Sequence, residues 1–436
     1  MHTLRPVADT PIAEPPIPLS AGSRPQDRAL IIPDDIGVFL AIARSLGRGG
    51  VEVDVATSEL DYPGLTSRYV NQVHLVPPYL KETSRWIETI AALTRSRGYR
   101  LIVPTSDSSL TLLALHAERL GRRNLAIAND EALAVFTDKA KTRMLADALD
   151  IPMASGIEVR PDTDPADLER ALGLPLILKP RSPYEPGNRQ AKTSASIVRR
   201  SENIAGAIAA YGGRGLLAER FFDGDGVGVS VLAHRGAIRL SWQHRRLAAV
   251  SDTGRSSRRI GEPVDPVLYD RVKTLCRATE LTGVAMFEFR QNPATGLHIL
   301  IEVNARFWGS LPLALEGGAD FPLALWRMQF PDEDYGPRES LRDGVSKCDL
   351  SGEYDRLTNL LRSDSKGAGL RASGGLVKLG IKTLIAPASF DSWAADDKRP
   401  YFAEVGKIVG LLGKALARRL RDFAVRRPNG NSGSGR

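Results

Sequence analysis

The sequence predicts two successive folding units, an α/β unit with a parallel, Rossmann-like sheet and then an α+β unit with antiparallel strands. Its 436 residues leave room for two or three domains of about 100 to 200 residues each. From Ala29 to Asp107, short β-type runs alternate with helical patterns, which is typical of a parallel sheet. Near Phe136 the pattern changes to longer mixed segments that end in a hairpin.

The composition is that of a soluble globular protein, with 42% apolar and 25% charged residues. Two cysteines, Cys276 and Cys348, allow at most one disulfide and exclude a zinc site built on several thiolates. This cysteine usage fits a reducing cytoplasm. Residues 1–28 contain no continuous apolar segment, and no run of about 18 apolar residues occurs anywhere, so neither export nor membrane spanning is expected.

The positive charge is concentrated at the C-terminus. Of the formal net charge of +8, residues 403–436 contribute +6, from eight Lys or Arg against two acids. The remaining residues therefore carry only +2, and we expect no nucleic-acid partner.

The first unit is expected to span residues 28–135, after a disordered leader over residues 1–27. Ligands of such sheets bind beyond the carboxyl ends of the strands, here the loops after Ile32 and Val103, although turn and helix-cap chemistry also explains those loops. No G-x-G-x-x-G follows the first strand, so a dinucleotide cofactor is unsupported. The expected elements are strands at 29–32, 51–57, 73–78 and 101–107 and helices over 38–46 and 81–96.

The second unit is expected to span residues 136–330. It opens with a helix that is capped by Thr137 or Asp138 and stopped by Pro152. A polar loop over residues 181–193 separates its first two strands. The expected elements after the first helix are strands at 175–180, 194–200, 216–222, 227–234 and 237–244, helices over 202–211 and 266–280, and a hairpin over 284–307.

The hairpin gathers polar residues on one face. Its turn, NPATG, leaves Glu288 and Glu302 nearly equidistant from the turn centre, so the two should be cross-strand neighbours. Strand alternation in the second strand predicts one face with Ile299, Ile301, Val303 and Ala305 and the other with Glu302, Asn304 and Arg306.

Two carboxylates about 4.5 to 5.5 Å apart at their Cβ atoms destabilise a sheet unless something compensates them. A divalent cation such as Mg²⁺, held by Glu288, Glu302 and the amide oxygen of Asn304, would do so. The alternative is a solvated face on which Arg306 and Arg290 neutralise the acids.

The spacing of E, thirteen residues, and then E-V-N-A-R resembles the metal-binding hairpin of the ATP-grasp superfamily. The resemblance extends over residues 136–327. NARFWGS is most similar to the carboligase-like members, which also resemble D-aspartate ligases and carbamoyl-phosphate synthetases. The upstream matches are Asp138 and Lys139 at the head of a helix ending in Ile151 and Pro152, Lys179 at a strand end, and Glu219 after the linker strand.

The resemblance implies a pre-ATP-grasp domain followed by an ATP-grasp fold of two α+β lobes, with ATP and Mg²⁺ (or Mn²⁺) as cofactors. The loop over residues 181–193 departs from the family, because it offers only Gly187, with Lys192 as a substitute phosphate contact. The implied roles are phosphate binding for Lys139 and Lys179, adenine binding for Leu217, Ala218 and Glu219, ribose binding for Asp223 or Asp225, metal binding for Glu288, Glu302 and Asn304, and stabilisation of the transferred phosphoryl group for Arg306 and Lys179.

The implied activity is an ADP-forming ligase that joins a small carboxylate to an amine or a thiol through an acyl phosphate. Alternatives are a bicarbonate-using carboxylase or carbamoyl-phosphate-type enzyme, and an inactive, membrane-associated ATP-binding scaffold. Trp308 and Ser310 would face the acceptor pocket, unless Phe307 and Trp308 are core aromatics. The sequence names neither the substrates nor the oligomeric state.

A C-terminal extension over residues 331–402 precedes a basic tail over residues 403–436, whose end is expected to be disordered. The tail predicts an amphipathic helix, either docked on the protein body or attached reversibly to an anionic membrane surface from the cytoplasm. Its apolar stripe is Val405, Ile408, Val409, Leu412, Leu416, Leu420 and Phe423, and Lys407, Lys414, Arg418, Arg419 and Arg421 lie off it.

Overall fold

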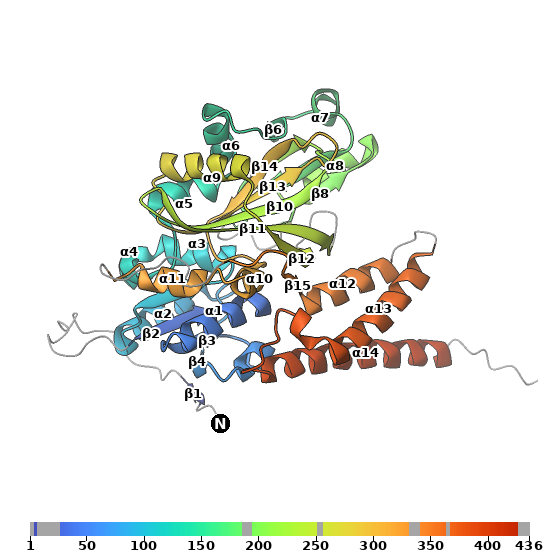
Figure 1. The fold of residues 1–436 in the computed structure, drawn as a ribbon. Coiled ribbons are helices and arrows are strands. Elements are labelled where there is room, and N and C mark those ends of the chain that lie inside the picture. The colour runs from blue at the N-terminus through green and yellow to red at the C-terminus, as the bar shows by residue number, and fades with distance from the viewer. Residues whose placement is uncertain are drawn as a thin grey trace, which may run out of the picture.

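The computed structural model describes residues 4–6, 27–184, 194–250, 256–330, 341–362 and 367–425. These residues form three β-sheets with helices packed around them (Figure 1). The α/β unit and the α+β unit predicted from the sequence are both present. Among the described residues, no helix combines the length and the apolar character that crossing a bilayer requires. Cys276 and Cys348 are buried, free thiols.

The first sheet is parallel throughout, with the order β1-β4-β3-β2-β5. Its inner strands β2 and β3 are buried over all but their first residue, as expected for strands covered on both faces. The strands are β1 (Leu4–Pro6), β2 (Arg28–Ile32), β3 (Glu52–Thr57), β4 (Val70–Leu75) and β5 (Leu101–Pro104). The helices and short turns of this part are α1 (Ile36–Arg48), η1 (Pro63–Thr66), α2 (Thr83–Arg97), α3 (Asp107–Leu115), α4 (Ala117–Leu120) and α5 (Asp130–Phe136).

Strand β1 corrects the prediction that the leader has no fold. Leu4–Pro6 lie parallel to β4, with Leu4 opposite Val73. An edge strand offers unpaired backbone groups to any short extended segment, and such pairing needs no apolar periodicity in that segment. The rest of the leader lies outside the described residues.

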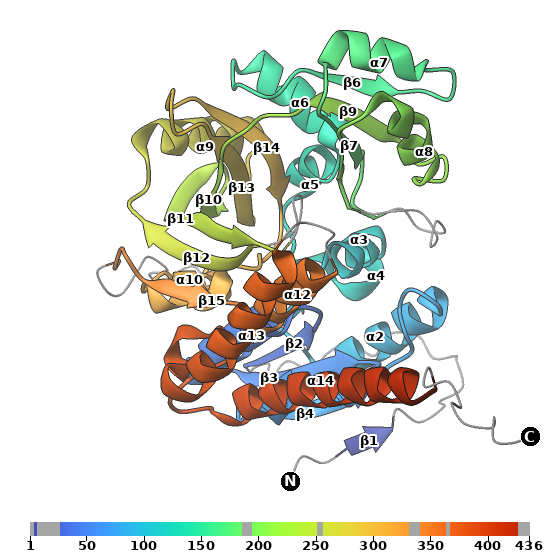
Figure 2. The same cartoon turned by 90° about the vertical axis from the view of Figure 1, so that its right-hand side faces the viewer.

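The α+β unit contains two antiparallel sheets, which Figure 2 shows side by side above the first sheet. The larger has the order β14-β13-β10-β11-β12-β15, and the smaller has the order β6-β9-β7-β8. The larger sheet is built from β10 (Asp225–His234), β11 (Ala237–Ala249), β12 (Ser256–Glu262), β13 (Gly283–Gln291), β14 (His298–Asn304) and β15 (Ser346–Cys348). The smaller is built from β6 (Gly156–Val159), β7 (Leu176–Pro180), β8 (Ser196–Val198) and β9 (Leu216–Arg220).

Helices of the α+β unit complete the cores on both sides. Buried residues of α10 and α11 pack in one cluster with α1 and the first sheet, so the segment after the hairpin docks back on the α/β unit. Asp138 caps α6 by accepting hydrogen bonds from Ala140 and Lys141, which confirms the predicted helix start. The helices are α6 (Lys139–Ala148), α7 (Pro165–Leu172), α8 (Ile204–Ala209), α9 (Pro266–Ala278), α10 (Leu311–Glu316) and α11 (Phe321–Arg327).

The C-terminal extension is joined to both units. Strand β15 adds to the larger sheet beside β12, and buried Asp397 accepts a hydrogen bond from buried Arg44 of α1 at 2.9 Å. Its helices are α12 (Leu350–Leu361), α13 (Ala368–Ile385) and α14 (Arg399–Val425), and they form the projecting edge at the right of Figure 1. The predicted tail helix therefore begins at Arg399, inside the extension, and not at residue 403.

Candidate active site

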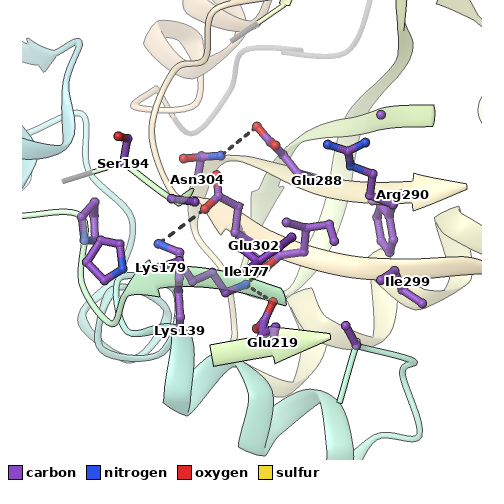
Figure 3. A pocket seen from close by; sticks show the side chains of 18 of the residues that line it. Lys139, Ile177, Lys179, Ser194, Glu219, Glu288, Arg290, Ile299, Glu302 and Asn304 are labelled. Atoms are coloured by element: carbon purple, nitrogen blue, oxygen red, sulfur yellow. Dashed lines mark hydrogen bonds and ion pairs between the residues drawn. The ribbon is translucent and has the colours of Figure 1, made fainter. Parts of the chain in front are cut away.

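The β13–β14 hairpin brings its two carboxylates together as predicted. Glu288 lies directly opposite Glu302 in the strand register (Figure 3). A bulge next to Glu288 makes this possible, because Phe289 pairs with Leu300 and not with Ile301. The extra residue absorbs the one-residue difference in distance from the turn.

The bulge also changes which side chains share a face. Leu300 and Val303 lie opposite Phe289 and Phe287 and belong with them and Ala305 to the core. Ile299 lies opposite Arg290 instead, and Ile301 is the extra residue of the bulge. The predicted common face of Ile299, Ile301, Val303 and Ala305 is therefore wrong, because alternation is interrupted where the bulge inserts a residue. The face with Glu302, Asn304 and Arg306 is confirmed.

Each acid has its own cation, but not the cations that the sequence suggested. Lys139 Nζ lies 3.4 Å from Glu302 Oε2, and Arg246 Nη2 lies 2.6 Å from Glu288 Oε2. Arg306 pairs with Asp107, and Arg290 donates to the carbonyl of Gly224. The alternative in which Arg306 and Arg290 neutralise the pair by direct contact is therefore not what the structure shows.

Arg246 reaches Glu288 across a strand that has glycines on this face. Strand β10 lies between β11 and β13, and it presents Gly226 and Gly228 toward this face. A Cβ on Gly226 would stand 2.7 Å from Arg246 Cδ, and one on Gly228 would stand 2.2 Å from His244 Cε1. The two glycines, at alternate strand positions, leave the space that the Arg246 and His244 side chains occupy.

Burial and charge divide the two acids. Burial alone would raise the pKa of Glu302, but Lys139, Lys179, Arg246 and Arg306 outweigh it and lower that pKa to about 2. Burial raises the pKa of Glu288, and the charge of Glu302 adds to this effect against the opposing Arg246. One carboxylate is thus firmly ionised, and its neighbour resists a second negative charge.

These residues fit a hard divalent cation. Two carboxylates face each other, and the Asn304 amide lies beside them, 3.3 Å from Glu288 Oε1. A cation there would favour the ionised form of Glu288, and the amide oxygen of Asn304 could serve as one of its ligands. Among the described residues, no group of three or more His, Cys, Asp or Glu could hold a metal. Mg²⁺ is usually held by one or two carboxylates, with water and phosphate oxygens as its other ligands.

Lys179 lies at the end of β7 and is buried. Its Nζ lies 2.7 Å from Glu219 Oε2 and donates to the carbonyl of Ile301 at 3.3 Å. Arg143 of α6 also pairs with Glu219. Burial lowers the pKa of Lys179, although Glu219 opposes this effect. Lys139, Lys179 and Glu219 are brought to one cavity, as Figure 3 shows.

Leu217 and Ala218 are not brought to that cavity. They lie in β9, whose neighbours β6 and β7 pair with both residues. Backbone pairing within the sheet therefore covers both edges of β9 at these positions. The residues of this segment that do line the cavity are Glu219 and the next three, through Phe222. Neither Asp223 nor Asp225 lines it, and Asp225 lies 3.4 Å from Arg245.

Two cavities meet at the hairpin. The larger, about 270 Å³, lies between the smaller sheet, the start of α6 and the hairpin. The second, about 220 Å³, extends under β11, β12 and the loop after β2. The residues that line both cavities are Arg246, Glu288, Glu302, Asn304 and Arg306. Gly187 and Lys192, the proposed phosphate-loop residues, lie outside the described residues.

Arg306 connects the hairpin to the α/β unit. Its guanidinium donates two hydrogen bonds to Asp107, at 2.7 and 2.8 Å. Asp107 is the first residue of α3 and belongs to the segment after Val103 that was expected to lie at the ligand-binding edge of the parallel sheet. The pKa of Arg306 is raised, because Asp107, Glu302 and Glu288 outweigh the effect of its burial. Asp35, from the loop after Ile32, lines the second cavity.

Trp308 lies in the core and also borders the second cavity. It is fully buried and packs edge-on against Phe321 at 5.0 Å between ring centroids, so it is a core aromatic. It also lines the second cavity together with Ser310. Sequence reasoning missed His244, Arg259 and Asp349, which complete that cavity.

The buried imidazole of His244 should make the fold less stable at acidic pH. Burial, with Arg246 and Arg259 nearby, lowers its pKa from 6.5 to about 3. The unfolded chain therefore binds one more proton than the folded chain between those values, and stability falls as the pH drops below about 6.5. Between pH 6.5 and pH 5, the free energy of unfolding of the parent protein should therefore fall. We expect this fall to be smaller by about 2 kcal/mol in His244→Gln, which has no imidazole to protonate. Thermal melting of both proteins at several pH values checks this, and parallel losses would contradict it.

Comparison with solved structures finds the same architecture. An L-amino acid ligase from Bacillus licheniformis has a TM-score of 0.58 at 19% identity, covering 74% of this chain and 79% of that one. A carboxyaminoimidazole ribonucleotide synthase from Aspergillus clavatus, complexed with ATP, has a TM-score of 0.57 at 17% identity, covering 74% and 82%.

A third similar structure is the biotin carboxylase domain of the 2-oxoglutarate carboxylase from Hydrogenobacter thermophilus, in complex with MgADP and bicarbonate. Its TM-score is 0.57 at 16% identity, and the match covers 73% of each chain. No family model and no curated protein matches this chain. Since the three structures are those of ATP-grasp enzymes and match about three quarters of this chain, this chain has the ATP-grasp fold.

Proposed function

We propose that the protein is an ADP-forming ligase that activates a small carboxylate with ATP and transfers the acyl group to an amine or a thiol. The observation that carries this proposal is the shared wall between the two cavities, formed by Arg246, Glu288, Glu302, Asn304 and Arg306. A nucleotide in one cavity and a carboxylate in the other would present their reacting ends to the same charged residues. Phosphoryl transfer depends chiefly on such positioning and charge stabilisation.

The larger cavity suits the nucleotide. Lys139 and Lys179 supply ammonium groups for phosphate oxygens, and the residues from Glu219 to Phe222 supply a boundary for the base. Glu288, Glu302 and Asn304 would hold Mg²⁺ or Mn²⁺, which when bound supplies positive charge against the phosphates. The similar synthase and carboxylase structures contain ATP and MgADP, which supports the assignment.

The second cavity suits a carboxylate. The guanidinium groups of Arg246, Arg259 and Arg306 line it, together with the neutral imidazole of His244. Arg259 is buried, pairs with Asp391 and donates to the carbonyl of Gly309 at 2.7 Å, so it is held rigidly. Fixed guanidinium groups recognise carboxylates through paired hydrogen bonds.

The proposed reaction has two steps. A carboxylate oxygen of the substrate attacks the γ-phosphorus, the bond to the β,γ-bridging oxygen breaks, and ADP leaves. The amine nitrogen then attacks the acyl carbon, phosphate leaves with the bonding electron pair, and the nitrogen loses a proton. Arg306 lies where it can stabilise negative charge on the transferred group, and Asp107 holds its guanidinium in place.

Bicarbonate is the second candidate substrate, because one of the similar structures binds it. The size of the second cavity favours a larger molecule. Its volume of about 220 Å³ greatly exceeds the roughly 10 to 15 Å³ that one water requires. A catalytically inactive scaffold would have no need to keep two opposed acids and a cation for each of them.

ADP release tests the proposal. The protein is incubated with ATP, Mg²⁺ and pools of small carboxylates, with hydroxylamine as a general amine acceptor that converts an acyl phosphate into a hydroxamate. We expect ADP, phosphate and hydroxamate in equal amounts with at least one pool. A parallel incubation with bicarbonate in place of the carboxylate pools tests the second candidate, because ADP release with bicarbonate alone would favour it. ATP turnover that ignores every added carboxylate, or its complete absence, would contradict the ligase assignment.

A further inference from the structure

Helix α13 exposes a stripe of large apolar side chains. The exposed fractions are 63% for Val377, 51% for Ile381, 83% for Leu384 and 78% for Ile385. Leu370, about two turns before Val377, belongs to the same stripe and is 83% exposed. Their spacing places them along one side of the helix. The opposite side packs inward through Ala368, Ala372 and Leu379. Such a stripe on an otherwise folded helix marks a surface that something covers.

Helix α14 also exposes apolar side chains. Its first turns are docked, since Tyr401 and Glu404 are buried and Val405 and Ile408 pack on the cluster around Phe390. The prediction of a docked helix holds for these turns. Farther along, Val409 is 60% exposed and Leu412 is 41% exposed, so the stripe predicted from the sequence leaves the protein body there.

The same two helices carry a large excess of positive charge. Helix α13 contains Arg371, Lys378 and Lys382 and no acid. Helix α14 contains six Lys or Arg and two acids, one of which, Glu404, is buried and accepts hydrogen bonds from Ser351 and Ser392. Anything that covers the apolar stripe must therefore be negatively charged around its apolar part.

We propose that the apolar faces of α13 and α14 dock on the surface of a bilayer that contains anionic lipid. A second copy of the chain would bring the same cations against each other, whereas acyl chains and anionic headgroups match both features. Both views place α13 and α14 at the end of the molecule away from α7 and the smaller sheet (Figures 1 and 2). Docking there would leave that lobe on the side away from the membrane.

Vesicle sedimentation of the full chain tests the proposal. The probes are vesicles of phosphatidylcholine alone and of phosphatidylcholine with about one third phosphatidylglycerol. We expect binding to the anionic vesicles that weakens at high salt. Val377→Gln with Leu384→Gln should reduce the partition coefficient at least about tenfold, and Arg371→Glu with Lys378→Glu should do so by a similar factor.

A matched control uses apolar residues of similar exposure elsewhere, Leu115→Gln with Val267→Gln, which are 61% and 54% exposed in the parent protein and should leave binding unchanged. Absence of binding to anionic vesicles at low salt would overturn the proposal, as would equal binding by the α13 variants. Dimers in analytical ultracentrifugation that disappear in Val377→Gln with Leu384→Gln would assign the face to a second copy. None of these readouts depends on the ligase activity.

Discussion

Glu302→Gln is expected to lower Mg²⁺-dependent ATP turnover by at least about a thousandfold. The reason is that Glu302 is the acid kept ionised by its surroundings, with a pKa lowered to about 2 against the effect of burial. The amide has nearly the same shape but cannot supply a negative oxygen to a cation between it and Glu288. ADP release by the purified variant, at saturating ATP and Mg²⁺ with the accepted carboxylate, measures the effect.

The control for this variant is Glu262→Gln. Glu262 lies in β12 of the same sheet and pairs with Arg245 at 2.7 Å, but it lines neither cavity. It should keep parent turnover. Both variants should still fold, because the Glu302 side chain faces a cavity and does not fill the core, and thermal melting of each variant checks this. Parent-level turnover by Glu302→Gln would end the interpretation of the hairpin as a metal site.

Lys179→Met is expected to weaken ATP binding by about tenfold to a hundredfold, the range of a charge-assisted contact to phosphate. Met keeps the length and apolar stem of the buried side chain, and Arg143 remains as a partner for Glu219. Titration calorimetry with ATP and, separately, with adenosine distinguishes two causes. Loss of a phosphate contact weakens ATP alone, whereas a general disturbance around Glu219 weakens both ligands.

Lys141→Met serves as the matched control for lysine removal near the site. Lys141 is exposed on α6, two positions after Lys139, and it does not line the cavity. Its replacement should leave both affinities unchanged. Equal ATP affinity in Lys179→Met and the parent protein would remove Lys179 from the nucleotide site.

The parts of the site that depend on short-range rules could be predicted from the sequence. The cap at Asp138 follows from local hydrogen bonding, and the pairing of Glu288 with Glu302 follows from one turn. Arg246 could not be found in this way, since its contact with Glu288 crosses the intervening strand β10. A strand order of that kind is set by the packing of the whole sheet.

The same distinction explains the remaining errors. The backbone at Leu217 and Ala218 was expected to be open to adenine, but β6 and β7 flank β9 on both sides, and β6 carries no strong strand pattern in the sequence. The bulge beside Glu288 is likewise invisible to strict alternation, because either strand of the hairpin can accommodate the extra residue.

The shared wall has a thermodynamic consequence for the affinities of ligands in the two cavities. Arg246 and Arg306 line both cavities. Glu288 partly neutralises the charge of Arg246, and Asp107 partly neutralises that of Arg306. A polyanion that enters with its own divalent cation changes the field across this wall, so it alters the free energy of binding a second anion on the far side. By reciprocity, that second anion must change the affinity for the polyanion by the same factor. The two ligands are therefore coupled even if no backbone atom moves.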